Sequence, residues 1–258
     1  MRTAILATTA SADLHANAAL ILAAIGQAAQ GGARVLLTPE CVLCGYPGAV
    51  RDDLHGVDWC ALHDAEDALA LAAERAGLVL LLGTSGRWRT GLANELLACG
   101  AVAPQRYRKR CLTPADQAHF AAGDQPLTIC VDGWTIGLGI CFDLRFAPCW
   151  ADLAAAGADL FAVAAHMAGP DPDPGTKAAI IPVLAQARAA EWATPLIFSN
   201  TAANDRYCDS AAWDARGLRT TSLAEGLRFV DVERRETLDP WYAALRTRHL
   251  EAVRAQRS

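Results

Sequence analysis

Hydrophobic and polar positions follow two alternating patterns along the chain. Short, nearly continuous apolar runs, such as Ala33–Pro39 and Leu78–Ser85, are typical of strands buried on both faces of a sheet. Longer runs with helical spacing lie between them, as in Asp13–Gln30 and Asp58–Ala76, and glycine follows each of these runs. The alternation of strands and helices predicts an α/β layered fold.

The same patterns continue to the C-terminal end of the chain. Further strands are expected at Thr3–Thr9, Glu95–Gly100, Arg106–Lys109, two within Leu127–Cys141, Asp159–Ala165 and Pro195–Asn200, with a β-rich stretch at Tyr207–Val232. Further helices are expected at Pro148–Gly157, at Lys177–Thr194 and from about Pro240 onward. This number of strands, with a hairpin turn at Asp132-Gly133, predicts more than one sheet and a mixed strand order.

Domain organisation follows from what separates these elements. The proline-rich segment Met167–Thr176 is a predicted loop that is too short for a domain linker, and no internal repeat occurs. With 258 residues, of which 53% are hydrophobic, the chain can bury a sizeable core. We therefore expect one domain over residues 1–258.

Charge and composition exclude several classes of protein. The formal net charge of -5 argues against a general nucleic-acid binder. The first residues lack the apolar run of a signal peptide, and the longest apolar helical run is too short and interrupted to span a membrane. These features predict a cytoplasmic protein, in which the nine cysteines are expected to be free thiols, metal ligands or one nucleophile. Phosphate-loop, dinucleotide and serine-hydrolase motifs do not occur.

Three residues stand where they can do chemistry. Cys141 ends a strand and begins a turn, where backbone N–H groups can stabilise a thiolate or an oxyanion. Lys109 offers an ammonium for the same purpose, and Glu40 follows a buried strand as a candidate general base. Taken singly, each also fits a simpler role: a core cysteine, a solvated basic edge and an exposed loop acid.

Taken together, three segments resemble the motifs of the nitrilase superfamily, the carbon–nitrogen hydrolases. The segments are PECVLCGYPG around Glu40, YRKRCLTP around Lys109 and GICFDLRFAP around Cys141, and they occur in the order that the family shows. Weaker likeness in ARAAEW (187–192) and LIFSN (196–200) extends the resemblance over nearly the whole chain. The sequence CFDLRF is more similar to the amidase and carbamoylase branch than to the true nitrilases.

The resemblance implies a fold and a reaction. It implies a four-layer α-β-β-α sandwich with two mixed β-sheets in a single domain, usually paired as a homodimer, with no cofactor and no metal. It also implies hydrolysis of a small amide, ω-amide or N-carbamoyl substrate. Cys141 would form a thioester, Glu40 would move protons, and Lys109 with the backbone N–H of Phe142 would hold the oxyanion.

Five further residues are expected to support the site. Asp116 stands where the family commonly has a second glutamate, and it is expected to position the substrate or Lys109, or to be a loop acid that caps the next turn. Phe142 and Tyr46 are expected to wall the pocket. Arg145 is a candidate for a substrate carboxylate, and His166 lies at a strand end that faces the pocket.

Two other functions stay open from the sequence. Cys41-x2-Cys44 and Cys60-x2-His63 have the spacing of a structural Cys3His zinc site, although the second pair lies in a helical run. A catalytically weak or inactive binding protein with the same fold is the other alternative, because Asp116 departs from the family pattern. The sequence does not identify the substrate.

Overall fold

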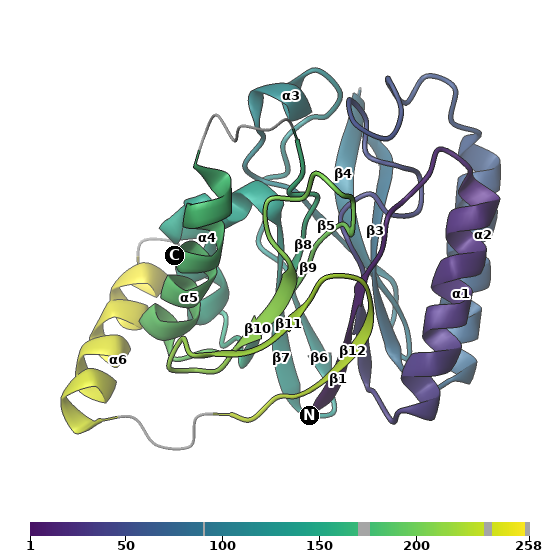
Figure 1. The fold of residues 1–258 in the computed structure, drawn as a ribbon. Helices are drawn as coiled ribbons and strands as arrows, with labels where there is room; N and C mark the ends of the chain where they lie inside the picture. The colour runs from purple at the N-terminus through teal and green to yellow at the C-terminus, as the bar shows by residue number, and fades with distance from the viewer. Residues whose placement is uncertain (90, 170–175, 235–238, 256–258) are drawn as a thin grey trace.

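The fold consists of two β-sheets between two layers of helices. The computed structural model describes residues 1–89, 91–169, 176–234 and 239–255. Within these residues, two mixed six-stranded sheets pack face to face, with α1 and α2 on one outer side and α4 and α5 on the other (Figure 1). The expected four-layer α-β-β-α sandwich is confirmed.

The first sheet has the strand order β12-β1-β2-β3-β4-β5. Its strands are β1 (Arg2–Ala7), β2 (Val35–Leu37), β3 (Val79–Trp88), β4 (Gly91–Gly100), β5 (Gln105–Arg108) and β12 (Gly226–Asp231). The central strands β1, β2 and β3 run parallel, while β12, β4 and β5 pair antiparallel. The carboxyl ends of the parallel strands therefore meet at one edge, where Glu40 follows β2.

The second sheet has the order β11-β10-β9-β8-β7-β6. Its strands are β6 (Thr128–Val131), β7 (Trp134–Ile140), β8 (Leu160–Ala164), β9 (Leu196–Ser199), β10 (Ser210–Trp213) and β11 (Arg219–Leu223). Here β7, β8 and β9 are the parallel strands. Cys141 follows β7 and His166 follows β8, so the candidate residues of this sheet also lie at carboxyl ends.

Helices cover the outer faces of both sheets. They are α1 (Leu14–Gln30), α2 (Trp59–Arg75), the short α3 (Pro114–Gln117), α4 (Ala147–Ala155), α5 (Lys177–Trp192) and α6 (Pro240–Ala255), with a 3-10 turn η1 (Cys141–Arg145). Asp13 and Asp58 cap α1 and α2, because each side chain accepts backbone N–H groups of the first turn. Helix α6 lies against α4 and α5. No helix in the described parts of the chain has the length and apolar character needed to cross a membrane.

Apolar residues on successive positions of the parallel strands supply two cores. In β2, Val35 and Leu37 pack between the two sheets, while Leu36 packs under α1 and α2. Both faces of these strands are therefore buried, which explains their continuous hydrophobicity.

The structure also differs from the sequence-based elements in places. The strands β3 and β4 form a longer hairpin than expected, because polar residues around Arg87 and Asn94 still pair across it. The short helix α3 was not predicted. The predicted proline-rich loop falls largely on residues 170–175, which lie outside the described residues.

Candidate active site

Glu40 lies buried at the edge of the first sheet. Its side chain is 2% exposed, and its Oε1 accepts hydrogen bonds from Lys109 Nζ and Asn94 Nδ2, both at 2.7 Å. Its Oε2 accepts the backbone N–H of His166 at 2.8 Å. Residues of both sheets therefore fix one carboxylate between them. Asn94 was missed in the sequence, because an asparagine inside a strand carries no signal until its partner is known.

Lys109 lies between two carboxylates. Its Nζ donates to Glu40 Oε1 at 2.7 Å and to Asp116 Oδ2 at 2.8 Å, and the residue is 1% exposed. Burial alone would lower the pKa of Lys109, but the charge of Glu40 and of the other anionic groups outweighs it and holds the pKa well above its usual value. Lys109 is therefore a fixed cation in the centre of the site.

Asp116 reaches Lys109 although it is shorter than glutamate. It lies in the first turn of α3, where Thr113 is the N-cap, and Asp116 and Thr113 form a capping box. Its Oδ1 accepts the hydroxyl of Tyr46 at 2.6 Å. Burial would raise the pKa of Asp116, but Lys109 and these hydrogen bonds lower it below its usual range. Asp116 therefore both caps α3 and accepts a hydrogen bond from Lys109.

Cys141 lies at the corner between β7 and η1. It is 5% exposed and has φ +46, a left-handed conformation that a non-glycine residue adopts at a cost of about 1–3 kcal/mol. Burial raises the pKa of its thiol well above the usual value, the charge of Glu40 adds to this effect, and Lys109 opposes it. The thiol is therefore protonated at rest and lies beside a base.

A hydrogen-bond network under the corner holds Cys141 in place. Asp143 Oδ2 accepts the backbone N–H of Ile140 at 2.9 Å and the hydroxyl of Tyr107 at 2.7 Å. Its Oδ1 accepts the backbone N–H of Cys111 at 2.9 Å. Asp143 thus connects the segment that carries Cys141 with the segment that carries Lys109.

Two of the other candidate residues contact this centre, Tyr46 through Asp116 and His166 through Glu40. The rings of Tyr46 and His166 stack with centroids 4.7 Å apart, and burial lowers the pKa of His166, which keeps its imidazole neutral. Met167 Sδ lies 3.7 Å from Cys141 Sγ. Arg145 lies with its guanidinium carbon 5.8 Å from the centroid of the Phe142 ring and has no hydrogen-bond partner among the described residues.

The four residues of the zinc hypothesis come from two places: Cys41 and Cys44 are buried after β2, while Cys60 and His63 lie on α2. Cys44 Sγ lies 3.3 Å from the Ser85 hydroxyl and is buried, whereas Cys60 is exposed. His63 Nδ1 lies 3.3 Å from Glu66 Oε2. The structure does not bring Cys41, Cys44, Cys60 and His63 together as one ligand set in the described residues. Sequence spacing alone suggested this set.

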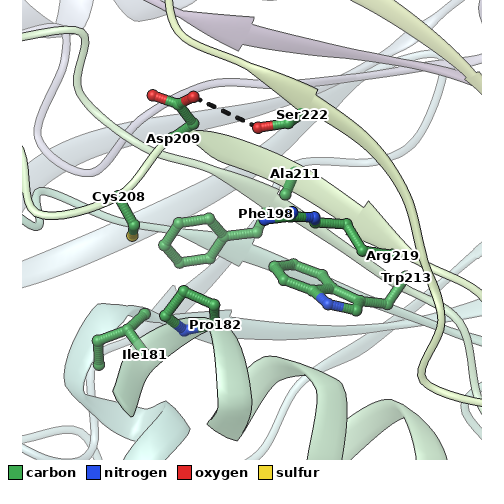
Figure 2. Close-up of a pocket in the computed structure, with 9 residues that line it drawn as sticks. All are labelled: Ile181, Pro182, Phe198, Cys208, Asp209, Ala211, Trp213, Arg219 and Ser222. Carbon is green, nitrogen blue, oxygen red and sulfur yellow. Dashed lines mark hydrogen bonds between the residues drawn. The ribbon is translucent and has the colours of Figure 1, made fainter. Parts of the chain in front are cut away.

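A separate cavity lies on the outer side of the second sheet. It has a volume of about 170 Å³, and Figure 2 shows its aromatic floor of Phe198 and Trp213 beside Pro182 of α5. Asp209 accepts a hydrogen bond from the Ser222 hydroxyl at its rim. None of Glu40, Lys109 and Cys141 lines this cavity. It is therefore distinct from the candidate active site.

Comparison with known proteins identifies relatives of the chain. A Mycobacterium tuberculosis protein named as a hydrolase is 30% identical over 176 residues, which is 64% of this chain and 61% of that protein. The match thus spans about three fifths of the length of this mycobacterial relative. A hydrolase of Pseudomonas protegens is 30% identical over 212 residues, which is 76% of this chain and 70% of that protein.

Solved structures of an amidase from Nesterenkonia sp. are similar in sequence and fold. The amidase itself is 27% identical with a TM-score of 0.76, covering 90% of each chain. A cysteine-to-alanine mutant of it in complex with butyramide has a TM-score of 0.79 at 26% identity, covering 99% of this chain and 95% of that one. The same amidase is described as a member of the nitrilase superfamily.

A family model also matches most of the chain. The model described as carbon-nitrogen hydrolase matches residues 2–236, which include all three motif segments. Together with the sandwich fold, this match confirms the resemblance drawn from those segments. The chain therefore belongs to the carbon–nitrogen hydrolase family, within the nitrilase superfamily.

Proposed function

We propose that this protein is an amidase that hydrolyses small amides through a cysteine thioester. One observation carries the proposal: Glu40 and Lys109 hydrogen-bond in a single buried site, where the charges of both groups act on the thiol of the buried Cys141. A base, a cation and a nucleophile in one buried site are the groups that acyl transfer from an amide requires.

The proposed reaction begins with proton transfer. Glu40 takes the thiol proton as Cys141 Sγ attacks the amide carbon, because the protonated resting thiol is a poor nucleophile. Lys109 and the backbone N–H of Phe142 stabilise the oxyanion that forms. Glu40 returns its proton to the nitrogen, the C–N bond breaks, and ammonia or an amine leaves a thioester on Cys141.

Water completes the cycle. Glu40 removes a proton from water, the resulting hydroxide attacks the thioester, and the carboxylic acid leaves as the proton returns to Cys141. Asp116 and Asn94 position Lys109 and Glu40 respectively through the hydrogen bonds described above. All steps of the proposed reaction use side-chain and backbone groups of this chain together with water.

The substrate class rests on the relatives and on Arg145. Mutants of the Nesterenkonia amidase were solved in complex with butyramide and with acrylamide, which supports a small aliphatic amide as substrate. Arg145 beside Phe142 suits a carboxylate at the far end of the substrate, as in an ω-amide or an N-carbamoyl amino acid. We infer that such carboxylated amides are hydrolysed alongside simple amides.

Cys141→Ala tests the reaction. Ammonia release is measured over simple amides, ω-amides, N-carbamoyl amino acids and nitriles, with Cys60→Ser as a control that changes an exposed thiol. We expect wild type and Cys60→Ser to release ammonia at equal rates, and Cys141→Ala to lose about 10⁴-fold or more. Activity that survives in Cys141→Ala contradicts the nucleophile. A wild type that binds amides without releasing ammonia from any of them supports the binding-protein alternative.

The remaining expectations stay predictions. These are the single-domain organisation, the homodimer and the cytoplasmic location. Sedimentation of the purified protein measures the oligomeric state directly.

A further inference from the structure

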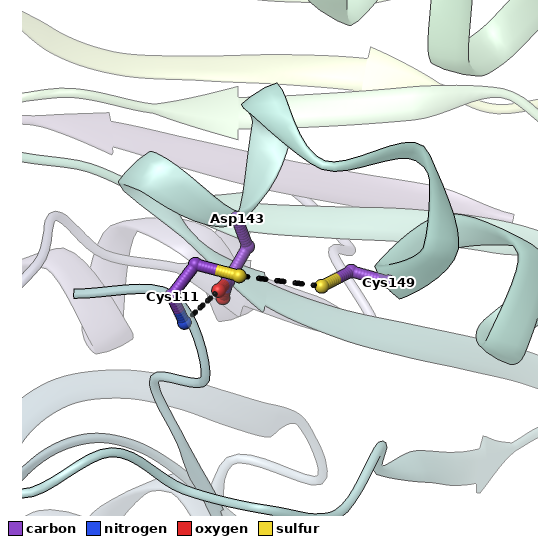
Figure 3. A group of neighbouring side chains, drawn as sticks. All are labelled: Cys111, Asp143 and Cys149. Atoms are coloured by element: carbon purple, nitrogen blue, oxygen red, sulfur yellow. Dashed lines mark hydrogen bonds between the residues drawn. The ribbon is translucent and has the colours of Figure 1, made fainter.

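Two cysteines outside the candidate catalytic set lie in contact. Cys111 Sγ and Cys149 Sγ are 3.6 Å apart, and neither forms a disulfide. Figure 3 shows the two sulfurs pointing toward each other. Cys111 follows β5 and is half-buried, while Cys149 lies in the first turn of α4 and is 6% exposed. An S–S bond of about 2.0 Å needs only a small further approach of the two sulfurs.

The pair lies between the two segments of the candidate active site. Cys111 comes two residues after Lys109, and Cys149 begins the helix that follows the Cys141 turn. Asp143 already connects these segments, because it accepts N–H groups of Cys111 and Ile140. A covalent link between the sulfurs would run parallel to that connection.

The surroundings favour thiol chemistry over metal binding. Cys111, Cys149 and Asp143 form a group of three ligand atoms within 4.8 Å of one another. However, both Asp143 oxygens already accept hydrogen bonds from Cys111, Ile140 and Tyr107. A zinc ion would therefore find two sulfurs and an occupied carboxylate instead of the four ligands it prefers.

The two thiols differ in character. The hydrogen bond between them lowers the pKa of Cys149 and raises that of Cys111, and the charges of Arg110 and Arg188 also favour the Cys149 thiolate. Thiolates are the reactive form of cysteine towards oxidants. Cys141 differs, because burial and Glu40 keep it protonated at rest.

We propose that Cys111 and Cys149 are a redox-active dithiol that hydrogen peroxide converts into a disulfide. The Cys149 thiolate attacks one peroxide oxygen, the O–O bond breaks, and the departing hydroxide takes a proton to become water. Cys111 then attacks the sulfur of the resulting sulfenic acid, the S–O bond breaks, and a second water leaves with the Cys111 proton. Two thiols are oxidised by two electrons, and one peroxide is reduced to two waters.

The disulfide lowers amidase activity, a consequence that rests on the proposed function. Closing the pair pulls the segment after Lys109 towards α4, and a displacement of about 1 Å in a catalytic group costs up to about 10²-fold in rate. Reduction by a dithiol reagent reverses the change. The Cys111–Cys149 pair thus makes the position of Lys109 depend on the concentration of hydrogen peroxide.

Peptide mass analysis of peroxide-treated wild-type protein tests the site without reference to activity. We expect a peptide pair joined through Cys111 and Cys149 that is two hydrogens lighter than the reduced pair and disappears on reduction. Treated wild-type protein without this joined pair overturns the proposal. Stoichiometric zinc that is lost in both Cys111→Ser and Cys149→Ser also overturns it, in favour of a metal site.

Ammonia release from an amide tests the consequence. We expect peroxide to lower wild-type activity by about tenfold or more, with recovery on reduction, and we expect Cys149→Ser and Cys111→Ser to resist. Cys60→Ser, which changes an exposed thiol on α2, should behave as wild type. Equal reversible inactivation of the two serine variants and wild type would place the oxidation at Cys141. That result would overturn the claim that the Cys111–Cys149 disulfide lowers amidase activity. A wild type without amidase activity refutes the proposed function, while the joined peptide still decides the dithiol.

Discussion

At the scale of the residue, the single carboxylate of Asp116 both caps α3 and accepts a hydrogen bond from Lys109. Its Oδ2 accepts Lys109 Nζ at 2.8 Å, the backbone N–H of Thr113 at 2.8 Å and the Thr113 hydroxyl at 2.9 Å. Its Oδ1 accepts the Tyr46 hydroxyl. The capping box brings the backbone of α3 close to Lys109, so that the shorter acid still reaches the ammonium.

Asp116→Asn removes this charge with little change in shape. The amide cannot accept all of these donors, and one of its oxygens becomes an NH2 group that faces a donor. We expect unfolding to become easier by about 1–3 kcal/mol and the turnover number to fall by about 10- to 100-fold. Urea unfolding and ammonia release measure the two effects. Asp124→Asn is the matched control, since Asp124 pairs with Arg89 at the exposed surface and should change stability by about 1 kcal/mol or less.

The shifted pKa values predict how stability depends on pH. The folded pKa of Asp116 is lowered, so its contribution is fully present above the ordinary carboxyl pKa of about 3.9 and is lost as pH falls through the folded pKa. The folded pKa of Lys109 is raised, so its contribution is present below about pH 10.4 and is lost as pH rises through the folded pKa.

Unfolding free energies measured from neutral pH down to about pH 2 check the acid side. The stability difference between wild type and Asp116→Asn should stay constant near neutrality and shrink in acid. A difference that grows as the pH falls contradicts the ionised, hydrogen-bonded Asp116.

At the scale of the element, the close approach of β3 to the Glu40 segment depends on one glycine. A Cβ atom on Gly83 would lie 1.9 Å from the backbone oxygen of Pro39. Backbone cannot move away as a flexible side chain can, so any larger residue must displace the segment that carries Glu40. Gly83 thereby positions Glu40 without touching the reacting groups.

Gly83→Ala is expected to destabilise the protein by about 1–3 kcal/mol. It is also expected to lower the turnover number, because the added Cβ displaces the segment that carries Glu40. Gly26→Ala is the matched control in α1, where an added Cβ meets nothing within 4 Å. Since alanine favours helix over glycine, that control should raise stability by about 0.4–1 kcal/mol and leave activity unchanged. Thermal unfolding measures whether each substitution lowers or raises stability. A neutral Gly83→Ala would show that β3 and the Glu40 segment can separate at little cost.

Local sequence predicted most elements because their signals are local. Asp13 before α1 and Asp132-Gly133 between β6 and β7 mark boundaries with side chains that act within a few residues. The extension of the β3–β4 hairpin and the short helix α3 were not predicted. Pairing across the sheet stabilises the former, and the contact of Asp116 with Lys109 holds the latter.

At the scale of the whole molecule, the two sheets join through buried polar contacts near the site. Tyr107 of β5 in the first sheet donates to Asp143 Oδ2, next to Cys141 and the second sheet. Both residues are buried, so the bond is not shared with water. The relative position of Lys109 and Cys141 therefore depends on how the sheets pack.

Tyr107→Phe keeps the ring and removes this bond between the sheets. Because the hydrogen bond is to an acid in a buried place, we expect a loss of about 1.5–3 kcal/mol in the free energy of unfolding. Thr220→Val, which removes a bond within the second sheet at 3.3 Å, should cost about 1 kcal/mol or less. Denaturant unfolding of both variants measures the difference. Equal losses of unfolding free energy in the two variants would mean that the hydrogen bond between the sheets stabilises the protein no more than an ordinary one.

The sequence by itself predicted the layers and the family, and it named Glu40, Lys109 and Cys141 as the candidate catalytic residues. Strand periodicity and motif order act over short stretches, and three matching motifs identify a family that one motif would not. Only the tertiary structure decided that Asn94 hydrogen-bonds Glu40, that Asp116 reaches Lys109 and that Cys111 contacts Cys149. It also decided that the four residues of the zinc hypothesis do not form one ligand set among the described residues. The physical reason is that these contacts join residues far apart in the chain. Their distances follow from the packing of two sheets, which no local pattern contains.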